Sequence, residues 1–240
     1  MLKLDNVTIS YKNVPTVQNF NLDMKEGQIV SLVGESGSGK TTVIRAVLGL
    51  LAGGGKVTEG SITFEGEDLL SYTPEQWRKL RGSDISMIFQ DALTALNPVM
   101  TIGKQMDEIY RCHEKISKKE AKMRSIKALK AVGIPDAELR YHAFPHELSG
   151  GMRQRVMIAM ALCCNPGLLI ADEPTTALDV TIQTQIVELL KDINKSEQNA
   201  MLFITHDLNL ARRICHKVVV MKDGVVVEAD ETEKLSLIHI

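Results

Sequence analysis

The sequence predicts an α/β fold built on a mainly parallel sheet. Short apolar runs are typical of strands that are buried on both faces, and the first run is also rich in β-branched residues. Stretches in which apolar residues recur at helical spacing lie between the runs. The runs are Gln28–Val33, Ile85–Phe89, Leu168–Ala171 and Met201–Thr205.

The first run leads into a glycine-rich loop and then into a helix. Gly34 closes the run, and the residues after Lys40 have helical spacing. We expect the three glycines at 53–55 to end this helix. The apolar residues of the helix are Val43, Ala46, Val47 and Leu50.

The other three runs each end in polar residues. These are Gln90 after the second run, Asp172 and Glu173 after the third, and His206 after the fourth. Ligand groups in an open parallel sheet collect at the carboxyl ends of the strands, so we expect these side chains to converge on one site. Between the third and fourth runs, one helical face is apolar, with Ile182, Ile186, Leu189, Leu190 and Ile193.

The remaining segments predict two additions to the sheet. From Gly103 to Cys164 the sequence is helical in pattern, with a capping box at Ser117 and Glu120, which predicts an inserted helical subdomain over about residues 91–164. Alternating segments predict a small antiparallel sheet, and an Asp-Gly turn predicts a hairpin. The segments are Leu2–Ile9, Phe20–Met24 and Ser61–Glu65, and the hairpin covers Val218–Val227 with its turn at Asp223-Gly224.

Length and composition limit the possible classes of protein. The 240 residues, 44% of them hydrophobic, predict one domain, which we assign to residues 1–234. The 28 lysines and arginines nearly balance the 30 acidic residues, so the charge gives no reason to expect a nucleic-acid partner. No apolar stretch approaches the roughly 20 residues of a membrane-spanning helix, and the N-terminus has no secretory pattern. We therefore expect a cytosolic chain.

The four cysteines form no C-x-x-C pair. They are expected to be reduced and packed in the protein, and a metal site is the less favoured interpretation. They are Cys112, Cys163, Cys164 and Cys215.

The last six residues, Leu235–Ile240, resemble the in-frame translation of a transposon end used in DNA-library preparation. We predict that residues 235–240 are a non-native tail read from this adapter, and we expect the natural protein to continue past about Lys234. The alternative is a genuine apolar tail, and the encoding nucleotide sequence distinguishes the two.

The octet Gly34–Thr41 matches the pattern G-x-x-x-x-G-K-[ST] of a phosphate-binding loop, and it lies between a predicted strand and a predicted helix. Its glycines allow the turn and let backbone N–H groups face phosphates, while the helix start adds positive potential. Lys40 is expected to neutralise β- and γ-phosphate oxygens, Thr41 to bind Mg²⁺ through its hydroxyl, and Thr42 to reach the α-phosphate. An ordinary glycine-rich turn that binds no ligand is the less favoured interpretation of this octet. The predicted nucleotide-binding residues here are Gly34, Ser36, Gly37, Ser38, Gly39, Lys40, Thr41 and Thr42.

Two carboxylates follow the buried run that ends at Ala171. Asp172 is expected to hold Mg²⁺ through its water shell, and Glu173 to polarise the water that attacks the γ-phosphate. Apolar strands often end in acidic residues for surface reasons alone. The phosphate-binding loop elsewhere in the chain favours the functional interpretation, and with it a P-loop NTPase fold.

A phosphate-binding loop alone would also fit a GTPase, a small-molecule kinase or a helicase. The segment Leu148–Arg155 separates these, because it resembles the signature sequence of ATP-binding-cassette (ABC) proteins. Ser149 and the N–H groups of Gly150 and Gly151 would form a second anion cradle at a helix start. An ordinary Ser-Gly-Gly helix start is the structural alternative. The resemblance implies that this cradle caps the ATP of an opposing subunit.

The same resemblance assigns the remaining positions. Tyr11 corresponds to the aromatic residue that stacks on adenine, and Gln90 to the glutamine that reaches Mg²⁺ and the attacking water. The loop Ala177–Asp179 corresponds to the segment that crosses the dimer interface, where Asp179 would lie near nucleotide. His206 corresponds to the histidine that contacts the γ-phosphate. A lone tyrosine or histidine is more often structural, but the order and context here favour function.

Within the family, the chain resembles the peptide and nickel importer branch. The segments that carry this resemblance are Asp91–Pro98 and Gly150–Leu162, with Ala92 and Ala95 departing from the usual Pro and Ser of that branch. The implied function is an ATPase that uses ATP and Mg²⁺ to drive uptake of di- or oligopeptides or a related small solute such as nickel. The implied partners are a second, non-identical ABC ATPase, two transmembrane permease subunits and an extracytoplasmic solute-binding protein. The chain would act at the cytoplasmic face of a bacterial or archaeal membrane, and branch members usually carry a C-terminal extension beyond the cassette.

Three alternatives compete with parts of this interpretation. The first is a soluble ABC protein acting in DNA repair or on ribosomes, which usually has two cassettes or a long coiled-coil insertion. The second is a catalytically idle regulatory subunit. The residues that disfavour it are all present, namely Lys40, Asp172, Glu173 and His206. The third is a lipid or RNA patch in the basic stretch between Lys115 and Lys130. Because its cations spread around the predicted helix, a solvated face is favoured there.

Overall fold

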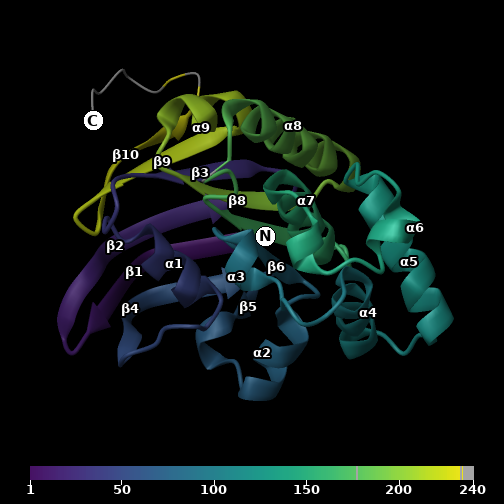
Figure 1. Ribbon diagram of the computed structural model, residues 1–240. Helices are drawn as coiled ribbons and strands as arrows, with labels where there is room; N and C mark the ends of the chain where they lie inside the picture. The colour runs from purple at the N-terminus through teal and green to yellow at the C-terminus, as the bar shows by residue number, and fades with distance from the viewer. Residues whose placement is uncertain (177, 233, 235–240) are drawn as a thin grey trace. The chain divides into compact units, whose positions relative to one another are not determined.

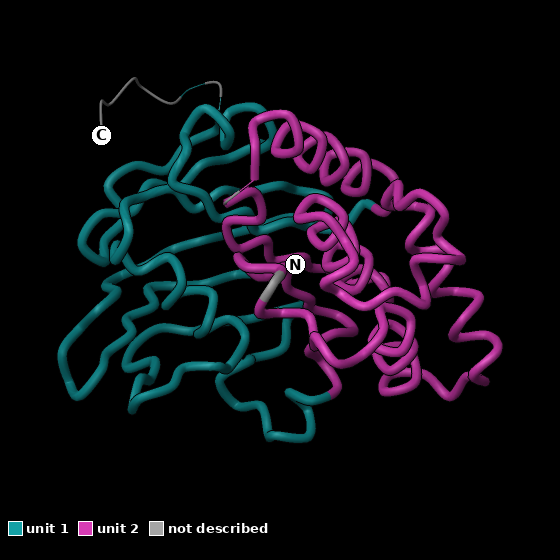
Figure 2. The backbone as a smooth tube through the Cα atoms, in the orientation of Figure 1, with its two compact units in different colours: residues 1–78, 198–240 teal, residues 79–197 magenta. Residues whose placement is uncertain are grey.

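The computed structural model describes residues 1–176, 178–232 and 234, and the chain forms two compact units (Figure 2). Unit 1 contains residues 1–78 and 198–240, and unit 2 contains residues 79–197. The boundary after residue 78 falls inside a short helix, α2 (Pro74–Leu80). The predicted non-native tail and Ala177 of the predicted interface loop lie outside the described residues. The division of the natural chain into one domain of residues 1–234 stays a prediction.

Unit 1 contains the antiparallel sheet that the alternating segments predict. Its strands are β1 (Leu2–Tyr11), β2 (Val14–Met24), β4 (Gly55–Phe64) and β5 (Glu67–Asp68), in the order β2-β1-β4-β5. Burial alternates at the start of β1 and along β2 from Phe20 to Met24, as expected where one face of a sheet supplies core. The residues of β1 from Val7 to Ser10 are all buried. Two turns of helix follow β5, namely η1 (Leu69–Ser71) and the start of α2.

The second group of strands in unit 1 positions the phosphate-binding loop. Its members are β3 (Ile29–Val33), β8 (Ala200–Thr205), β9 (Lys217–Lys222) and β10 (Val225–Glu231), in the order β10-β9-β3-β8. β3 pairs in parallel with both β8 and β9, and every residue of β3 and β8 is buried. β10 returns antiparallel through a turn in which Asp223 and Gly224 have φ values of 48° and 81°, as a type I′ turn requires. The predicted strands and hairpin are confirmed.

The helix after the loop is shorter than predicted. α1 covers Lys40–Val47, and Leu50 lies outside it with 45% of its surface exposed. The reason is Gly49, whose φ of 61° is left-handed. The N–H of Gly49 donates to the carbonyl of Ala46 and the N–H of Leu50 to the carbonyl of Arg45, and these two bonds end the helix at Val47. The glycines at 53–55 therefore lie beyond an end that has already formed. The last helix of unit 1, α9, covers Leu208–Ile214.

Unit 2 contains two parallel strands, β6 (Ile85–Ile88) and β7 (Leu168–Asp172). They pair from Ile85 with Leu168 to Ile88 with Ala171, and all of β7 is buried. The two predicted runs are confirmed as strands. Their parallel register brings the residues after Ile88 and after Ala171 to the same edge.

Helices form the rest of unit 2 (Figure 1). Those between residues 91 and 164 are the elements that the sequence predicts as helical, and Ser117 caps α5 by accepting a hydrogen bond from the N–H of Glu120 at 3.1 Å. That residues 91–164 form a separate subdomain stays a prediction. The helices of unit 2 in this range are α3 (Ala92–Ala95), α4 (Ile102–His113), α5 (Lys118–Ala131), α6 (Ala137–Arg140), η2 (Pro145–Glu147) and α7 (Gly150–Ala161). A further helix, α8 (Val180–Glu197), follows β7.

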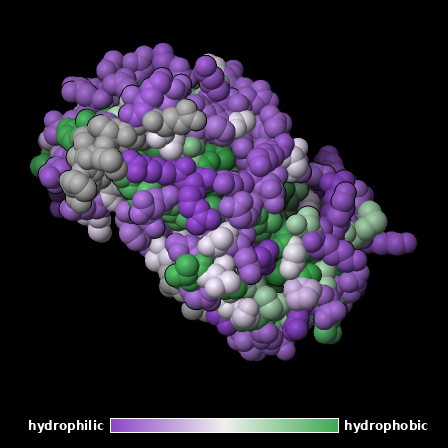
Figure 3. Space-filling view, turned by 90° about the horizontal axis from the view of Figure 1, so that it is seen from above, coloured by the Kyte–Doolittle hydropathy of each residue, from purple (hydrophilic) through white to green (hydrophobic). Residues whose placement is uncertain are grey.

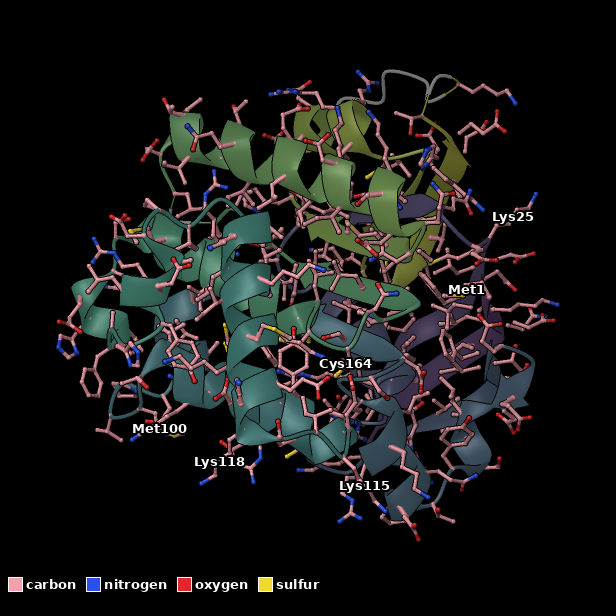
Figure 4. All side chains as sticks on the ribbon, turned by 90° about the vertical axis from the view of Figure 1, so that its right-hand side faces the viewer. Met1, Lys25, Met100, Lys115, Lys118 and Cys164 are labelled. Atoms are coloured by element: carbon pink, nitrogen blue, oxygen red, sulfur yellow. The ribbon has the colours of Figure 1, made fainter. Side chains whose placement is uncertain are left out.

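The basic stretch of unit 2 is largely exposed to solvent, and Arg124 within it is paired with two acids. Lys115 and Lys118 lie at the surface in Figure 4 and are exposed. Arg124 donates to Glu114 at 2.6 Å and to Glu120 at 2.7 Å. These pairs lower the positive potential that a polyanion would meet.

The cysteines are all free thiols, but they are not all packed. Burial raises the pKa of the Cys163 and Cys215 thiols to about 12, so these two are protonated at neutral pH. Cys112 is exposed at the end of α4, which contradicts the expectation of packing. The cause is its position on the outer side of an amphipathic helix, whose buried residues include Met106 and Tyr110.

The surface seen in Figure 3 is mainly hydrophilic, with hydrophobic residues in small groups. Of the helices in the described ranges, none combines the length and apolarity that a membrane crossing needs.

Gly60 in β4 provides a test of the antiparallel sheet. Its φ is 82°, and a Cβ there would lie 2.4 Å from the backbone oxygen of Asp5 on β1. We expect Gly60→Ala to lower the free energy of unfolding by about 2–5 kcal/mol, from left-handed strain together with overpacking. Gly66→Ala is the matched control, because its φ is 83° and nothing lies within 4 Å of its added methyl. It should cost only the strain, about 1–2 kcal/mol. Urea unfolding of both variants measures the difference, and equal losses would contradict the packing described here.

Candidate functional site

The predicted phosphate-binding loop joins β3 to α1 in unit 1 and has an open outer side. Gly37 has a φ of 85°, and a Cβ built there would meet nothing within 4 Å. Ser36 and Thr41 are exposed on the same loop. Gly34 is tightly enclosed instead, since its Cβ would lie 2.2 Å from the backbone oxygen of Met221 on β9. The loop is thus fixed to the sheet at its start and has room for a ligand at its tip.

Lys40 is held inside the loop. Its side chain is 5% exposed, and its Nζ donates to the carbonyl oxygens of Gly34 and Glu35 at 2.7 Å each and to Ser38 Oγ at 3.3 Å. The ammonium therefore stands at the first residue of α1, where the helix N-terminus adds positive potential. The side chain of Ser38 faces inward toward this ammonium, with 4% exposure, so its predicted contact with nucleotide stays a prediction.

The loop fits a triphosphate by its chemistry. The first N–H groups of α1 have no partner within the helix. A lysine ammonium and two threonine hydroxyls, those of Thr41 and Thr42, follow directly at the helix start. Oxyanions are the ligands that N–H groups and an ammonium bind.

Two more predicted residues of unit 1 have clear structural surroundings. Tyr11 is the last residue of β1, and its ring lies against Gly55, where a Cβ would approach Cε1 to 2.5 Å. His206 follows β8 and is exposed. The next residue, Asp207, caps α9 by accepting hydrogen bonds from the N–H groups of Asn209 and Leu210. The contacts of Tyr11 and His206 with nucleotide stay predictions.

Unit 2 brings Gln90 and Glu173 together. Asp172 ends β7 with 9% exposure, and Glu173 follows it in a left-handed backbone conformation, with φ of 43°. Gln90 follows β6, and its Nε2 donates to Glu173 Oε2 at 3.1 Å. The parallel register of β6 and β7 explains this meeting, as the convergence of strand ends predicts.

The sequence reasoning missed Thr176. Its Oγ1 also donates to Glu173 Oε2, at 2.9 Å. Only one signal for it exists in the sequence, namely a hydroxyl three residues after a candidate catalytic carboxylate. Whether that hydroxyl reaches the carboxylate depends on the turn after β7, which the pattern of residues does not fix.

The signature segment forms an exposed helix start in unit 2. Ser149 caps α7 by accepting a hydrogen bond from the N–H of Met152 at 3.3 Å, and both Ser149 and Gly150 are exposed. At Gly151 the helix comes close to α8, since a Cβ would lie 2.9 Å from Cγ2 of Ile182. The cradle predicted from the Ser-Gly-Gly sequence is therefore open to solvent in its own unit, as capping a second molecule's ligand would require.

Gln90 and the signature helix share one cavity of about 220 Å³ within unit 2. Its walls include Gln90, Gly150, Arg153, Thr176 and Leu178. The predicted residues of the signature and of the strand edge are thus neighbours in this unit.

Asp179 has a structural contact that the sequence reasoning did not assign. Its Oδ1 accepts a hydrogen bond from the N–H of Ile182 at 2.9 Å, which caps α8. Asp179 is exposed, and its predicted place in a dimer interface stays a prediction.

The chain is similar to known transport proteins over nearly its whole length. The family model described as ABC transporter matches residues 17–176. The chain is 47% identical to the oligopeptide transport ATP-binding protein OppD of Bacillus subtilis (strain 168), over 98% of the chain and 67% of that protein. It is 43% identical to the dipeptide transport ATP-binding protein DppD of Lactococcus lactis subsp. cremoris (strain MG1363), over 98% of the chain and 69% of that protein. The chain thus spans about two thirds of the length of these relatives.

A solved structure has the same fold. It is a dimeric ATP-binding cassette in a post-hydrolysis state bound to ADP and Pi, with a TM-score of 0.85, 32% identity, and coverage of 97% of this chain and 99% of that one. The phosphate-binding loop, the signature helix and these similarities lead to one conclusion. The chain belongs to the ABC transporter family, as a nucleotide-binding subunit with ATPase activity.

Proposed function

We propose that the chain is the ATP-binding and ATP-hydrolysing subunit of an ABC importer that takes up di- or oligopeptides. The observation that carries this proposal is the similarity, at 43–47% identity over 98% of the chain, to proteins named for oligopeptide and dipeptide transport. The family to which the chain belongs supplies the coupling of ATP hydrolysis to transport.

The proposal assigns a separate part of the work to each unit. In unit 1, Lys40 and the N–H groups of the loop bind the β- and γ-phosphates, and Tyr11 stacks on the adenine. His206 contacts the γ-phosphate. In unit 2, Glu173 polarises the attacking water, and Ser149 with its two glycines caps the nucleotide of an opposing subunit.

Mg²⁺ fits the donor set that the sequence predicts. Thr41 offers an exposed hydroxyl, Asp172 a carboxylate at the end of β7, and Gln90 an amide oxygen, and a small hard cation prefers oxygen ligands. Gln90 donates a hydrogen bond from its Nε2 to Glu173 and would use its amide oxygen for Mg²⁺. When bound with ATP, Mg²⁺ would neutralise phosphate charge.

The proposed partners follow from the same function. They are a second, non-identical ABC ATPase, two permease subunits and an extracytoplasmic solute-binding protein, with this chain at the cytoplasmic face of the membrane. The segment after β6 offers exposed apolar side chains for contact with a permease, because Phe89 is 50% and Val99 79% exposed. Closure of two ATPase subunits over ATP would drive the permeases only if ATP binds the closed state better than the open one.

Glu173→Gln tests the chemistry of transport. In the transporter reconstituted with its partners in lipid vesicles, we expect peptide-stimulated ATP hydrolysis and peptide uptake to fall at least about 100-fold, because the general base is lost. ATP affinity should stay within about twofold, and ATP should trap the two ATPase subunits as a dimer on sedimentation.

Glu108→Gln on the exposed side of α4 is the matched control and should leave both rates unchanged. Hydrolysis by the Glu173→Gln transporter at the wild-type rate would refute the assigned role. Wild-type transporter that hydrolyses ATP without responding to any peptide would refute the proposed cargo.

Lys40→Met tests the phosphate-binding loop. Removing an ammonium that makes charge-assisted hydrogen bonds to phosphate should weaken ATP binding at least about tenfold. Lys25→Met removes the same charge from an exposed position of unit 1 and should leave ATP affinity unchanged (Figure 4). Equilibrium titration of each purified variant with ATP makes the comparison, and equal affinities for the two variants would rule out the role of Lys40.

Ser149→Ala separates a ligand cradle from an ordinary helix cap. Ser117→Ala removes the same kind of cap, since each serine accepts a hydrogen bond from the N–H three residues on, at 3.3 Å and 3.1 Å. Both variants should lose about 1 kcal/mol of stability. Only Ser149→Ala should slow ATP turnover, because only that hydroxyl would meet nucleotide. Thermal unfolding and ATPase assays of the two variants decide, and the cradle is disproved if their turnover is the same.

A further inference from the structure

Glu173 Oε2 accepts hydrogen bonds from two side chains of unit 2. Gln90 Nε2 donates at 3.1 Å and Thr176 Oγ1 at 2.9 Å. Both donors come from exposed residues, and Glu173 itself is half-buried. A carboxylate in such surroundings would sample several orientations if it had no donors, because water competes for each oxygen.

The two donors differ in how they are attached. Thr176 lies three residues after Glu173, and its backbone N–H donates to the carbonyl of Glu173 at 3.1 Å. The same residue therefore binds both the backbone and the carboxylate of Glu173. Gln90 reaches the carboxylate from a different segment, after β6.

The neighbouring residue fixes this turn to a helix. Thr175 is 6% exposed, and its hydroxyl accepts a hydrogen bond from Gln183 Nε2 on α8 at 3.2 Å. Glu173 begins the turn in a left-handed conformation with φ of 43°, which a non-glycine residue adopts only when its surroundings hold it there. The position of the Thr176 hydroxyl is thus determined by the residues that precede it in the turn.

We propose that Thr176 is a positioning residue for the ATPase reaction, whose hydroxyl keeps the Glu173 carboxylate in the orientation that activates water. This inference rests on the proposed role of Glu173 as general base. Gln90 is also assigned to Mg²⁺, so its bond to Glu173 is the one that changes when nucleotide binds. The Thr176 hydroxyl belongs to the same turn as the carboxylate and keeps its bond in both states.

If Thr176 positions Glu173, removal of the Thr176 hydroxyl should leave the affinity for ATP unchanged. Thr176 touches the carboxylate and does not belong to the phosphate-binding loop, which lies in unit 1. Loss of its hydroxyl should therefore lower kcat and leave the KM for ATP unchanged, as expected for an interaction that matters in the transition state alone.

Three variants of the reconstituted transporter test this. Thr176→Val keeps the shape of the side chain and removes the hydroxyl, and we expect kcat about tenfold lower with KM within twofold of wild type. Thr176→Ser restores a hydroxyl and should recover at least half of the wild-type kcat. Thr184→Val is the matched control, because the Thr184 hydroxyl donates to the carbonyl of Val180 in its own helix at 3.0 Å, and the kcat of this variant should be unchanged.

The outcomes separate the proposals. Wild-type kcat in Thr176→Val, or a Thr176→Ser variant as slow as Thr176→Val, would overturn the role of Thr176. A fall in ATP affinity and melting temperature together with kcat would show a structural role and overturn it as well. If Thr176→Val does not fold, Thr176→Ala removes the hydroxyl with less bulk and is judged by the same criteria. Absence of ATP hydrolysis by the wild-type transporter would be a failure of the proposed function itself, and the inference would fall with it.

Discussion

A buried ammonium needs hydrogen-bond acceptors, and in this chain Lys40 finds them in the backbone of its own loop. That constraint shapes unit 1. The carbonyls of Gly34 and Glu35 turn inward toward the ammonium, and the carbonyl of Glu35 also accepts a hydrogen bond from the N–H of Ser38 at 3.2 Å. β3 places Gly34 against β9 so closely that no side chain would fit, which anchors the start of the loop. The proposed binding surface for phosphates would in this way be prepared before nucleotide arrives.

In unit 2, the pairing of strands positions the side chains that are proposed to act in catalysis. There the parallel pairing of β6 with β7 delivers an amide and a carboxylate to one edge, and short turns add a hydroxyl. The signature helix presents its capped start to solvent nearby, at the wall of the same cavity. Strand pairing thus places the groups that are proposed to act in catalysis, while helix starts supply the positive potential that favours anions.

Much of this could be predicted from the sequence, because the strands that matter are buried on both faces. Burial on both faces leaves short apolar runs whose ends are easy to locate, as β3, β7 and β8 show. The phosphate-binding loop could also be predicted from the sequence, because its pattern of residues reflects a local backbone conformation. The predicted end of α1 lay too far along the chain, because Leu50 continues the apolar spacing past Gly49. The spacing of apolar residues does not reveal that Gly49 has a left-handed backbone conformation.

Other features depend on contacts that no local pattern records. Whether Thr176 reaches Glu173 is decided by the turn after β7, and the capping of α8 by Asp179 depends on where that helix begins. The exposure of Cys112 depends on which side of α4 faces the core. For each of them, residue type was compatible with several environments, and only the fold selected one.

The left-handed backbone at Glu173 limits what evolution can place there. Glycine and asparagine suit that conformation best, and a long acidic side chain suits it poorly, at a cost of about 1 kcal/mol or more. Backbone preference alone would leave this position to glycine, and the proposed role of Glu173 as general base would explain why a carboxylate occupies it. Inactive descendants of such a subunit, released from the demand for turnover, would be expected to drift toward asparagine or glycine at this residue and to become slightly more stable as they do.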